Sequence, residues 1–117
     1  MTKRSLELFI DDIIEAINKI ERYTRGMDFS EFKNNELVVD AVIRNLEVIG
    51  EASTHLPANI KEKYSTLPWK RIIGLRNIAI HGYFKLDTSM IWAIITKNIP
   101  KTKEIMFEIK KEYSESR

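Results

Sequence analysis

The sequence predicts an all-α fold, an up-and-down bundle of four to five helices in a single domain that spans residues 1–117. Two observations predict helices: apolar residues recur at spacings of three and four over long segments, and glycine or proline stands where those segments end or bend. A third observation favours one domain. The 117 residues are 44% hydrophobic and 31% charged, enough for one core, and no linker or repeat divides them.

The first helix is predicted over residues 5–23. Its apolar residues recur at three and four positions, and acidic and polar residues fill the opposite face. Gly26 is expected to close this helix. The following stretch, 28–35, has little apolar content, so we expect a connector there with one helical turn around Phe29 and Phe32.

The second helix is predicted over residues 36–55 and is apolar on nearly all sides. Such a helix must be covered, either at the centre of a bundle or between the core and a partner subunit. Glu51 lies on this helix, and a covered carboxylate needs a cationic partner, for which Arg76 is the candidate. His55 comes near the end of the helix, before Pro57, where a partly cationic imidazole is favourable, so we interpret it as structural.

Shorter helices follow. A short exposed helix is predicted over residues 59–64, after Pro57 has ended the second helix. Pro68 suits the first turn of a further helix, which Trp69 is expected to anchor in the core. This helix leads directly into residues 76–83.

The last long helix is predicted to continue to Tyr113, with Asp87 or Thr88 as its N-cap. Pro100 lies inside this helix and removes one backbone hydrogen bond. We therefore expect a kink or a split there. Trp92, near the start of the helix, is expected to be a core or interface residue.

Composition limits the classes of function. The chain has no cysteine, which excludes a disulfide framework, a thiolate nucleophile and a sulfur-ligated zinc site. Its two histidines lie far apart in the sequence, which disfavours a histidine-rich metal site. The net charge of +2 is too small to indicate nucleic-acid binding by itself. The N-terminal residues pass at once into a helical pattern with acidic residues, so we expect no signal peptide, no membrane anchor and a cytoplasmic protein.

One stretch of eight residues, 76–83, holds a cation, an amide, an imidazole and a phenol between two apolar segments. These groups belong to Arg76, Asn77, His81 and Tyr83. Arg76 and His81 are five positions apart, which on a regular helix at about 100° per residue leaves them roughly 140° apart around the axis. Either Gly82 lets the chain leave the helix, or two copies of the stretch meet across a dimer axis.

Such a group of side chains suits ribonuclease chemistry. A histidine can take the proton from a ribose 2′-hydroxyl and protonate the leaving 5′-oxygen, because both of its protonation states exist near neutrality. The Arg76 guanidinium can stabilise the charge that develops on the phosphorane oxygens, and Asn77 can orient the phosphate or the imidazole. No metal or other cofactor is needed for this reaction, and the sequence offers no carboxylate cluster to hold a metal.

The same residue types also have ordinary structural roles. An arginine, a histidine and a tyrosine at a helix end are often a cap, a salt-bridge donor and a packed aromatic. The residues taken alone therefore leave both interpretations open.

Two runs of the sequence resemble one family. The first, from Pro68 to Phe84, reads PWKRIIGLRNIAIHGYF and is followed by Asp87 and an Ile-Trp pair. The second, from Arg44 to Ala52, reads RNLEVIGEA. Together they are similar to the HepT-like branch of the HEPN superfamily, whose core pattern of Arg, four residues, His, one residue and Tyr is met by Arg76, His81 and Tyr83.

The resemblance implies an all-helical domain that forms a homodimer and acts as a metal-independent endoribonuclease on RNA. It further implies a toxin of a toxin–antitoxin pair whose antitoxin is a minimal nucleotidyltransferase. Arg76 and His81 would be the catalytic pair, with Asn77 and Glu51 in support, and Tyr83 would be the residue that the partner modifies with AMP. The alternative is a non-catalytic HEPN protein that binds a nucleotide or docks the nucleotidyltransferase.

Overall fold

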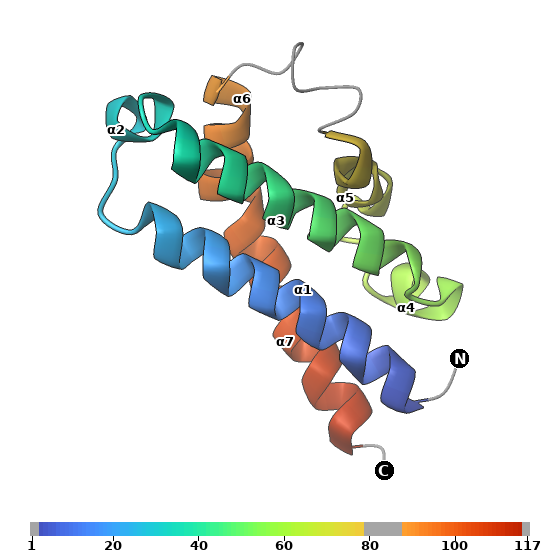
Figure 1. Ribbon diagram of the computed structural model, residues 1–117. Coiled ribbons are helices and arrows are strands. Elements are labelled where there is room, and N and C mark those ends of the chain that lie inside the picture. The colour runs from blue at the N-terminus through green and yellow to red at the C-terminus, as the bar shows by residue number, and fades with distance from the viewer. Residues whose placement is uncertain (1–2, 79–87, 116–117) are drawn as a thin grey trace.

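Figure 1 shows a bundle of helices in the computed structural model, which describes residues 3–78 and 88–115. Within those two ranges no strand occurs, so the predicted all-α class is confirmed. The helix nearest the N-terminus and the one nearest the C-terminus bring the two ends of the chain to the same end of the bundle (Figure 1). No helix in the described ranges is long and apolar enough to cross a membrane.

The first helix, α1, spans Lys3–Thr24 and forms one side of the core. Ile10, Ile13 and Ile17 on its apolar face are fully buried, as the spacing of three and four predicted. The helix packs against α3 and α7. Gly26 follows it with a φ of 77°, a left-handed conformation that glycine adopts without steric cost, so this residue closes the helix as expected.

The connector contains a complete short helix, α2, at Phe29–Lys33. Asp28 caps it: the Asp28 carboxylate accepts from the Glu31 backbone N–H at 2.8 Å, and the Glu31 carboxylate accepts from the Asp28 backbone N–H at 3.1 Å. Phe32 is fully buried, and its ring centroid lies 5.1 Å from that of Trp92. The predicted turn around Phe29 and Phe32 is confirmed.

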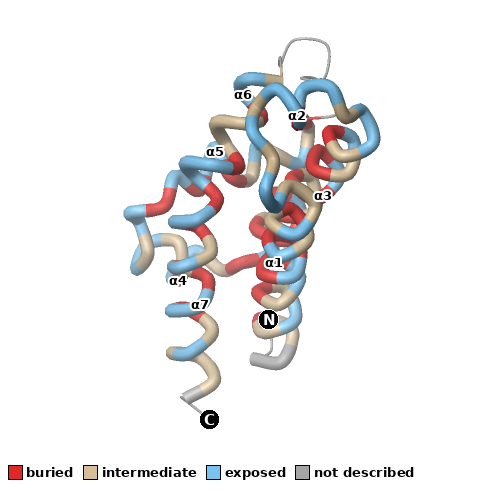
Figure 2. The backbone as a smooth tube through the Cα atoms, turned by 90° about the vertical axis from the view of Figure 1, so that its left-hand side faces the viewer, coloured by how far each residue is buried: buried red, intermediate tan, exposed pale blue. Residues whose placement is uncertain are grey.

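The helix α3, Glu36–Thr54, lies at the centre of the bundle but is not covered on all sides. It packs against α1 on one side and against α5 and the segment after α5 on another. A third strip stays open, because Leu37 is 80% exposed and Arg44 and Glu51 are also exposed. The bundle therefore leaves this strip, which lies between the two packed faces, uncovered within one chain, and its coverage by a partner subunit stays a prediction. Figure 2 shows that the buried positions of α1 and α3 face the interior.

Two short helices follow, α4 at Ala58–Lys63 and α5 at Trp69–Gly74. Pro68 precedes α5 as its N-cap, and Trp69 is buried with its indole Nε1 donating to the Tyr64 carbonyl at 3.1 Å. The α5 helix is much shorter than the sequence predicted. It ends at Gly74 and continues as a 3₁₀ turn, η1, at Leu75–Asn77.

The last helical segment is split, as Pro100 predicted. It consists of α6 (Thr88–Ala93), a π-helical stretch, η3 (Ile94–Asn98), and α7 (Ile99–Glu115). Proline has no backbone N–H and its ring clashes with the carbonyl four residues earlier, so the wider π turn just before it accommodates Pro100 in the first turn of α7. Thr88 is the first residue of α6, and the other predicted cap, Asp87, lies outside the described residues.

A polar cluster ties α4 to the far end of α7. The Glu112 carboxylate accepts hydrogen bonds from the Lys63 ammonium and from the Tyr64 hydroxyl. The hydrogen bonds from Lys63 and Tyr64 hold the pKa of Glu112 below its ordinary value. Burial and the bond to Glu112 raise the pKa of Tyr64 to about 12.

We expect Tyr64→Phe to lower the melting temperature by a few degrees near neutral pH, because it removes the hydrogen bond from the Tyr64 hydroxyl to Glu112. The lowered pKa of Glu112 means that its contribution is present above the ordinary carboxyl pKa and is lost as the pH falls. The raised pKa of Tyr64 means that its contribution is present below about pH 10 and is lost as the pH rises through about 12. Thermal melts from pH 3 to 12 should show the difference shrinking at both ends, with Tyr23→Phe as the matched control. A difference that stays constant with pH would contradict the assignment.

Candidate active site

The structure places Arg76 and Asn77 in η1, outside a regular α-helix. Gly74 ends α5, so the chain leaves α-helical geometry before Arg76. The separation of roughly 140° between Arg76 and His81 and the break at Gly82 stay predictions. His81, Gly82 and Tyr83 lie outside the described residues.

The backbone of Arg76 rests directly on α3, and Gly50 makes this possible. A side-chain carbon built on Gly50 would fall closer than 3.0 Å to the backbone nitrogen of Arg76. It would also lie only 3.0 Å from the carbonyl oxygen of Ile72 and from the carbonyl carbon of Leu75. Gly50 is buried, and no side chain other than hydrogen fits there. The glycine of the run RNLEVIGEA thus sets how closely the arginine of the motif approaches the central helix.

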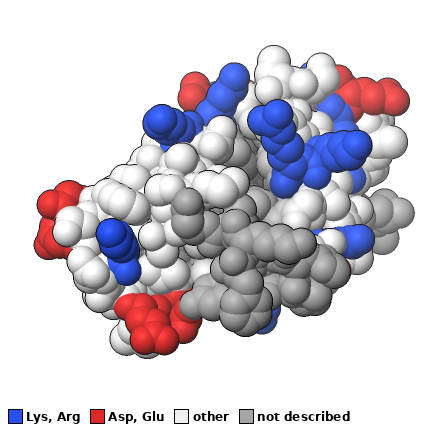
Figure 3. Space-filling model, turned by 90° about the horizontal axis from the view of Figure 1, so that it is seen from above, with Lys and Arg blue, Asp and Glu red and all other residues white. Residues whose placement is uncertain are grey.

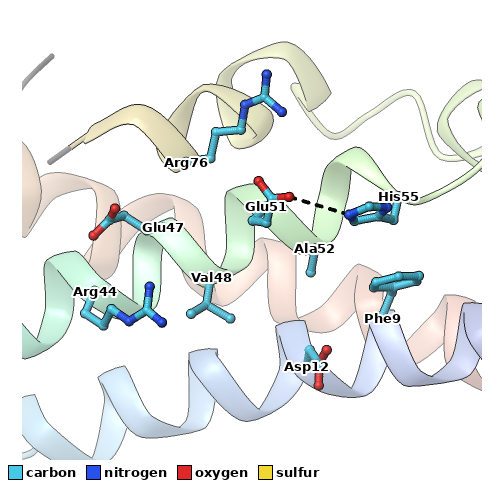
Figure 4. A pocket seen from close by; sticks show the side chains of 9 residues that line it. All are labelled: Phe9, Asp12, Arg44, Glu47, Val48, Glu51, Ala52, His55 and Arg76. Carbon is cyan, nitrogen blue, oxygen red and sulfur yellow. Dashed lines mark ion pairs between the residues drawn. The ribbon is translucent and has the colours of Figure 1, made fainter. Parts of the chain in front are cut away.

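Arg76 lines a pocket of about 350 Å³ between η1, α3 and α1. The pocket carries both signs of charge, with Arg44 and Arg76 against three carboxylates, Asp12, Glu47 and Glu51. Figure 4 shows that the Arg76 guanidinium points away from the Glu51 carboxylate. Arg76 is exposed, and within the described part of the chain it has no ion-pair partner. Its charge is therefore available to an anion from solution.

Glu51 is not paired with Arg76 as the sequence suggested. Its Oε1 lies 3.5 Å from Nε2 of His55, one turn further along α3 (Figure 4). The expectation of an arginine partner rested on a covered helix, but the Glu51 side chain is 62% exposed and stays hydrated. Asn77 is half-buried in η1, next to Arg76.

Sequence reasoning treated His55 as a structural residue and missed that it lines the same pocket as Arg76. His55 is the C-cap of α3, and its ring stacks on Phe9 with the centroids 4.5 Å apart and the planes 8° apart. The i, i+4 spacing of Glu51 and His55 could have indicated their pairing. No sequence signal indicated that α1 would contribute Phe9 and Asp12 to the pocket, because that depends on how α1 packs against α3.

Ionisable side chains of the described ranges do not gather into a metal-binding group. In those ranges no three His, Asp or Glu side chains come together in a way that could hold a metal ion. The three carboxylates of the Arg76 pocket are spread over α1 and α3 (Figure 4).

Comparison with known proteins finds a family and several relatives that are described as ribonucleases. The family described as Ribonuclease HepT-like matches residues 13–109, which include both runs of the sequence discussed above. A relative from Methanocaldococcus jannaschii named "Putative RNase MJ1380" is 43% identical over 104 residues, which cover 89% of this chain and 95% of the relative. A relative from Thermococcus cleftensis named "Probable ribonuclease HepT" is 39% identical over 101 residues, covering 86% of this chain and 92% of the relative. No solved structure was found to match.

Proposed function

This chain belongs to the HepT-like ribonuclease family, and we propose that it is the toxin of a toxin–antitoxin pair that cleaves RNA without a metal ion. Membership of the family makes it an endoribonuclease. The family match spans residues 76–83, where the pattern of Arg, four residues, His, one residue and Tyr is complete. That coincidence of family and complete motif is the observation that carries the proposal. A toxin that acts on cellular RNA acts in the cytoplasm, which is the location that we propose.

The proposed reaction is an attack of the ribose 2′-oxygen on the adjacent phosphorus. The His81 imidazole takes the proton of the 2′-hydroxyl as the new oxygen–phosphorus bond forms. The bond from phosphorus to the 5′-oxygen breaks, and an imidazolium, from the same or a second copy of His81, gives a proton to that oxygen. The products are a 2′,3′-cyclic phosphate and a 5′-hydroxyl. Neither a metal ion nor an oxidant takes part in this reaction.

The role proposed for Arg76 is to stabilise the transition state. Negative charge builds on the non-bridging oxygens during the attack, and a guanidinium offers two parallel N–H donors to such oxygens while staying charged. The exposure of Arg76 and its lack of an ion-pair partner among the described residues support this role. Asn77, next to it in η1, is proposed to orient the phosphate.

We further propose that the protein acts as a homodimer with two motifs at one cleft. An isologous interface would place the same patch of both copies opposite itself, so a histidine of each copy could serve as base and acid. Leu37 on the exposed strip of α3 is 80% exposed, which leaves one large apolar side chain of this chain open to a partner. Size-exclusion chromatography with light scattering should give twice the chain mass of 13.7 kDa.

A cleavage assay with the purified protein tests the activity. With EDTA present, a mixed-sequence RNA should be cut, and the products should carry 2′,3′-cyclic phosphates. Finding 3′-hydroxyl and 5′-phosphate ends, or cleavage only after a divalent ion is added, would contradict the proposed chemistry. If the protein binds a nucleotide or a nucleotidyltransferase and leaves every RNA intact, the non-catalytic alternative is favoured.

Silencing by the partner is proposed to occur at Tyr83. A nucleotidyltransferase antitoxin would transfer AMP from ATP to the Tyr83 hydroxyl with release of pyrophosphate, which adds a bulky anion two residues from His81. After incubation with ATP, Mg²⁺ and the partner, mass spectrometry should find AMP on Tyr83 and RNA cleavage should stop. Tyr83→Phe should cleave RNA but resist silencing. AMP found only on another residue, or a Tyr83→Phe variant that is silenced as the wild type is, would count against this assignment.

A further inference from the structure

A second pocket, of about 470 Å³, lies between the α5–η1 segment and the η3–α7 segment. This volume is within the range of about 300–1,000 Å³ that small-molecule sites occupy. Its surface is mainly apolar, with Ile72 and Leu75 on one side and Ile94 on the other. Leu75 lines this pocket and the next residue, Arg76, lines the first pocket, so the two pockets flank the same η1 segment.

Among the described residues, the charged side chains that line this pocket are all cations. Arg71 comes from α5, Lys97 from η3 and Lys101 from α7, and no aspartate or glutamate lines the pocket. The Arg76 pocket differs in having three carboxylates. On the face seen in Figure 3, Lys and Arg side chains gather in the upper part while Asp and Glu lie toward the edges.

These three cations are exposed and, among the described residues, are not in ion pairs. Some other lysines of the described surface have carboxylate partners within 4 Å, whereas Lys33 and Lys111 have none in the described part of the chain. Examples of the pairs are Lys19 with Glu15, Lys103 with Glu21 and Lys110 with Asp11. What distinguishes Arg71, Lys97 and Lys101 is that they lie together around one apolar hollow, where three cations without an ion-pair partner among the described residues give a positive potential.

One wall of the pocket comes from the η3–α7 part of the last helical segment. Ile94, Lys97 and Lys101 are spaced by three and four positions along η3 and the start of α7, so that apolar surface and two ammonium groups line the same wall. Arg71 lies on the opposite wall, one turn before Leu75 on the same segment. An apolar slot with cations on both walls fits a base with its flanking phosphates.

We propose that this pocket is a nucleotide subsite for single-stranded RNA, in which one base lies against Ile72, Leu75 and Ile94 and the flanking phosphates contact Arg71, Lys97 and Lys101. The subsite rests on the proposed ribonuclease function, because it holds the substrate beside the cleavage site. The arginine provides a bidentate fork and the lysines provide mobile point charges. The strand must be single because a paired base is not free to enter a slot. The subsite would add affinity for RNA on the η1 segment that carries Arg76.

The test uses a triple variant, Arg71→Ala with Lys97→Ala and Lys101→Ala, and a control of equal charge, Arg25→Ala with Lys33→Ala and Lys111→Ala. Both lower the formal net charge by three, from +2 to −1. All three control residues are exposed and do not line this pocket. Binding is measured by fluorescence anisotropy with a labelled ten-nucleotide single-stranded RNA, in a His81→Ala background so that the probe is not cut.

The pocket variant should bind at least about tenfold more weakly at low salt, and its plot of log Kd against log salt should lose about 2 in slope, since each phosphate contact on a single strand contributes about 0.7. The control variant should bind within about twofold of its parent. With His81 restored, the pocket variant should raise KM while kcat changes little. Lys97→Arg with Lys101→Arg should retain binding, which separates the loss of charge from misfolding.

Equal affinity and salt slope in the pocket and control variants would overturn the subsite, even if the wild type cleaves RNA. Loss of a nucleotidyltransferase partner or of the dimer, with RNA binding intact, would also overturn it and assign the pocket to a protein surface. If no form of the protein cleaves RNA, the proposed function fails, and the binding measurements still decide whether the pocket holds a nucleotide.

Discussion

Arg76→Ala should reduce kcat for RNA cleavage by about 10²–10³, because removing a single donor to a developing oxyanion costs about that much. The fold should be unaffected. Arg76 is exposed and has no ion-pair partner among the described residues, so the free energy of unfolding should change by no more than about 0.5 kcal/mol. Single-turnover cleavage of a labelled RNA, with thermal melts on the same samples, measures both quantities. Arg25→Ala, another exposed arginine, is the control and should cleave as the wild type does.

Arg76→Lys adds a second line of evidence. A lysine keeps the positive charge but loses the planar fork, so it should recover only part of the activity. Full activity in both Arg76 variants would mean that the guanidinium takes no part in the transition state. A parallel loss of activity and of melting temperature would mean that Arg76 is structural.

Gly50→Ala should destabilise the protein by about 1–3 kcal/mol, although alanine is the better helix former. The added methyl group would collide with backbone atoms of Ile72, Leu75 and Arg76. Backbone atoms cannot move aside as the end of a flexible side chain can. The α5–η1 segment must shift away from α3 and carry Arg76 with it. Since a displacement of about 1 Å in a catalytic group can cost 10²-fold, kcat should fall strongly even where the variant remains folded.

Gly74→Ala is the matched control. Gly74 is also helical, but a methyl group there would meet nothing within 4 Å. This variant should be neutral or more stable by about 0.5–1 kcal/mol, and it should cleave RNA normally. The comparison fails if Gly50→Ala melts and cleaves as Gly74→Ala does, because the close approach of η1 to α3 would then have no consequence.

Much of the fold follows from local patterns. The first helix was predictable from its apolar spacing and from Gly26, and the split in the last helix from Pro100, since each depends on neighbouring residues alone. The early end of α5 was not predicted. A glycine inside a helical pattern only weakens that pattern, and whether the helix stops there depends on packing against α3.

The sequence predicted the residue types of the candidate active site, but not the residues that surround Arg76 in the pocket. The motif pointed to Arg76, but the partner expected for Glu51 was wrong, because the exposure of one strip of α3 decides which charges need compensation. The sequence also did not predict that Gly50 allows η1 to approach α3 closely. A glycine in the middle of an apolar helix does not reveal which backbone lies over it, since that partner is a segment more than 20 residues further along the chain.

The central claim is that this chain cuts RNA through His81 without a metal ion. The most direct test incubates purified wild type and His81→Ala with one labelled RNA in the presence of EDTA and follows the appearance of cyclic-phosphate products. The wild type should cleave the RNA, and His81→Ala, folded as judged by its melting temperature, should leave it intact. Equal cleavage by the two proteins from clean preparations, or cleavage by the wild type that EDTA abolishes, would contradict the account.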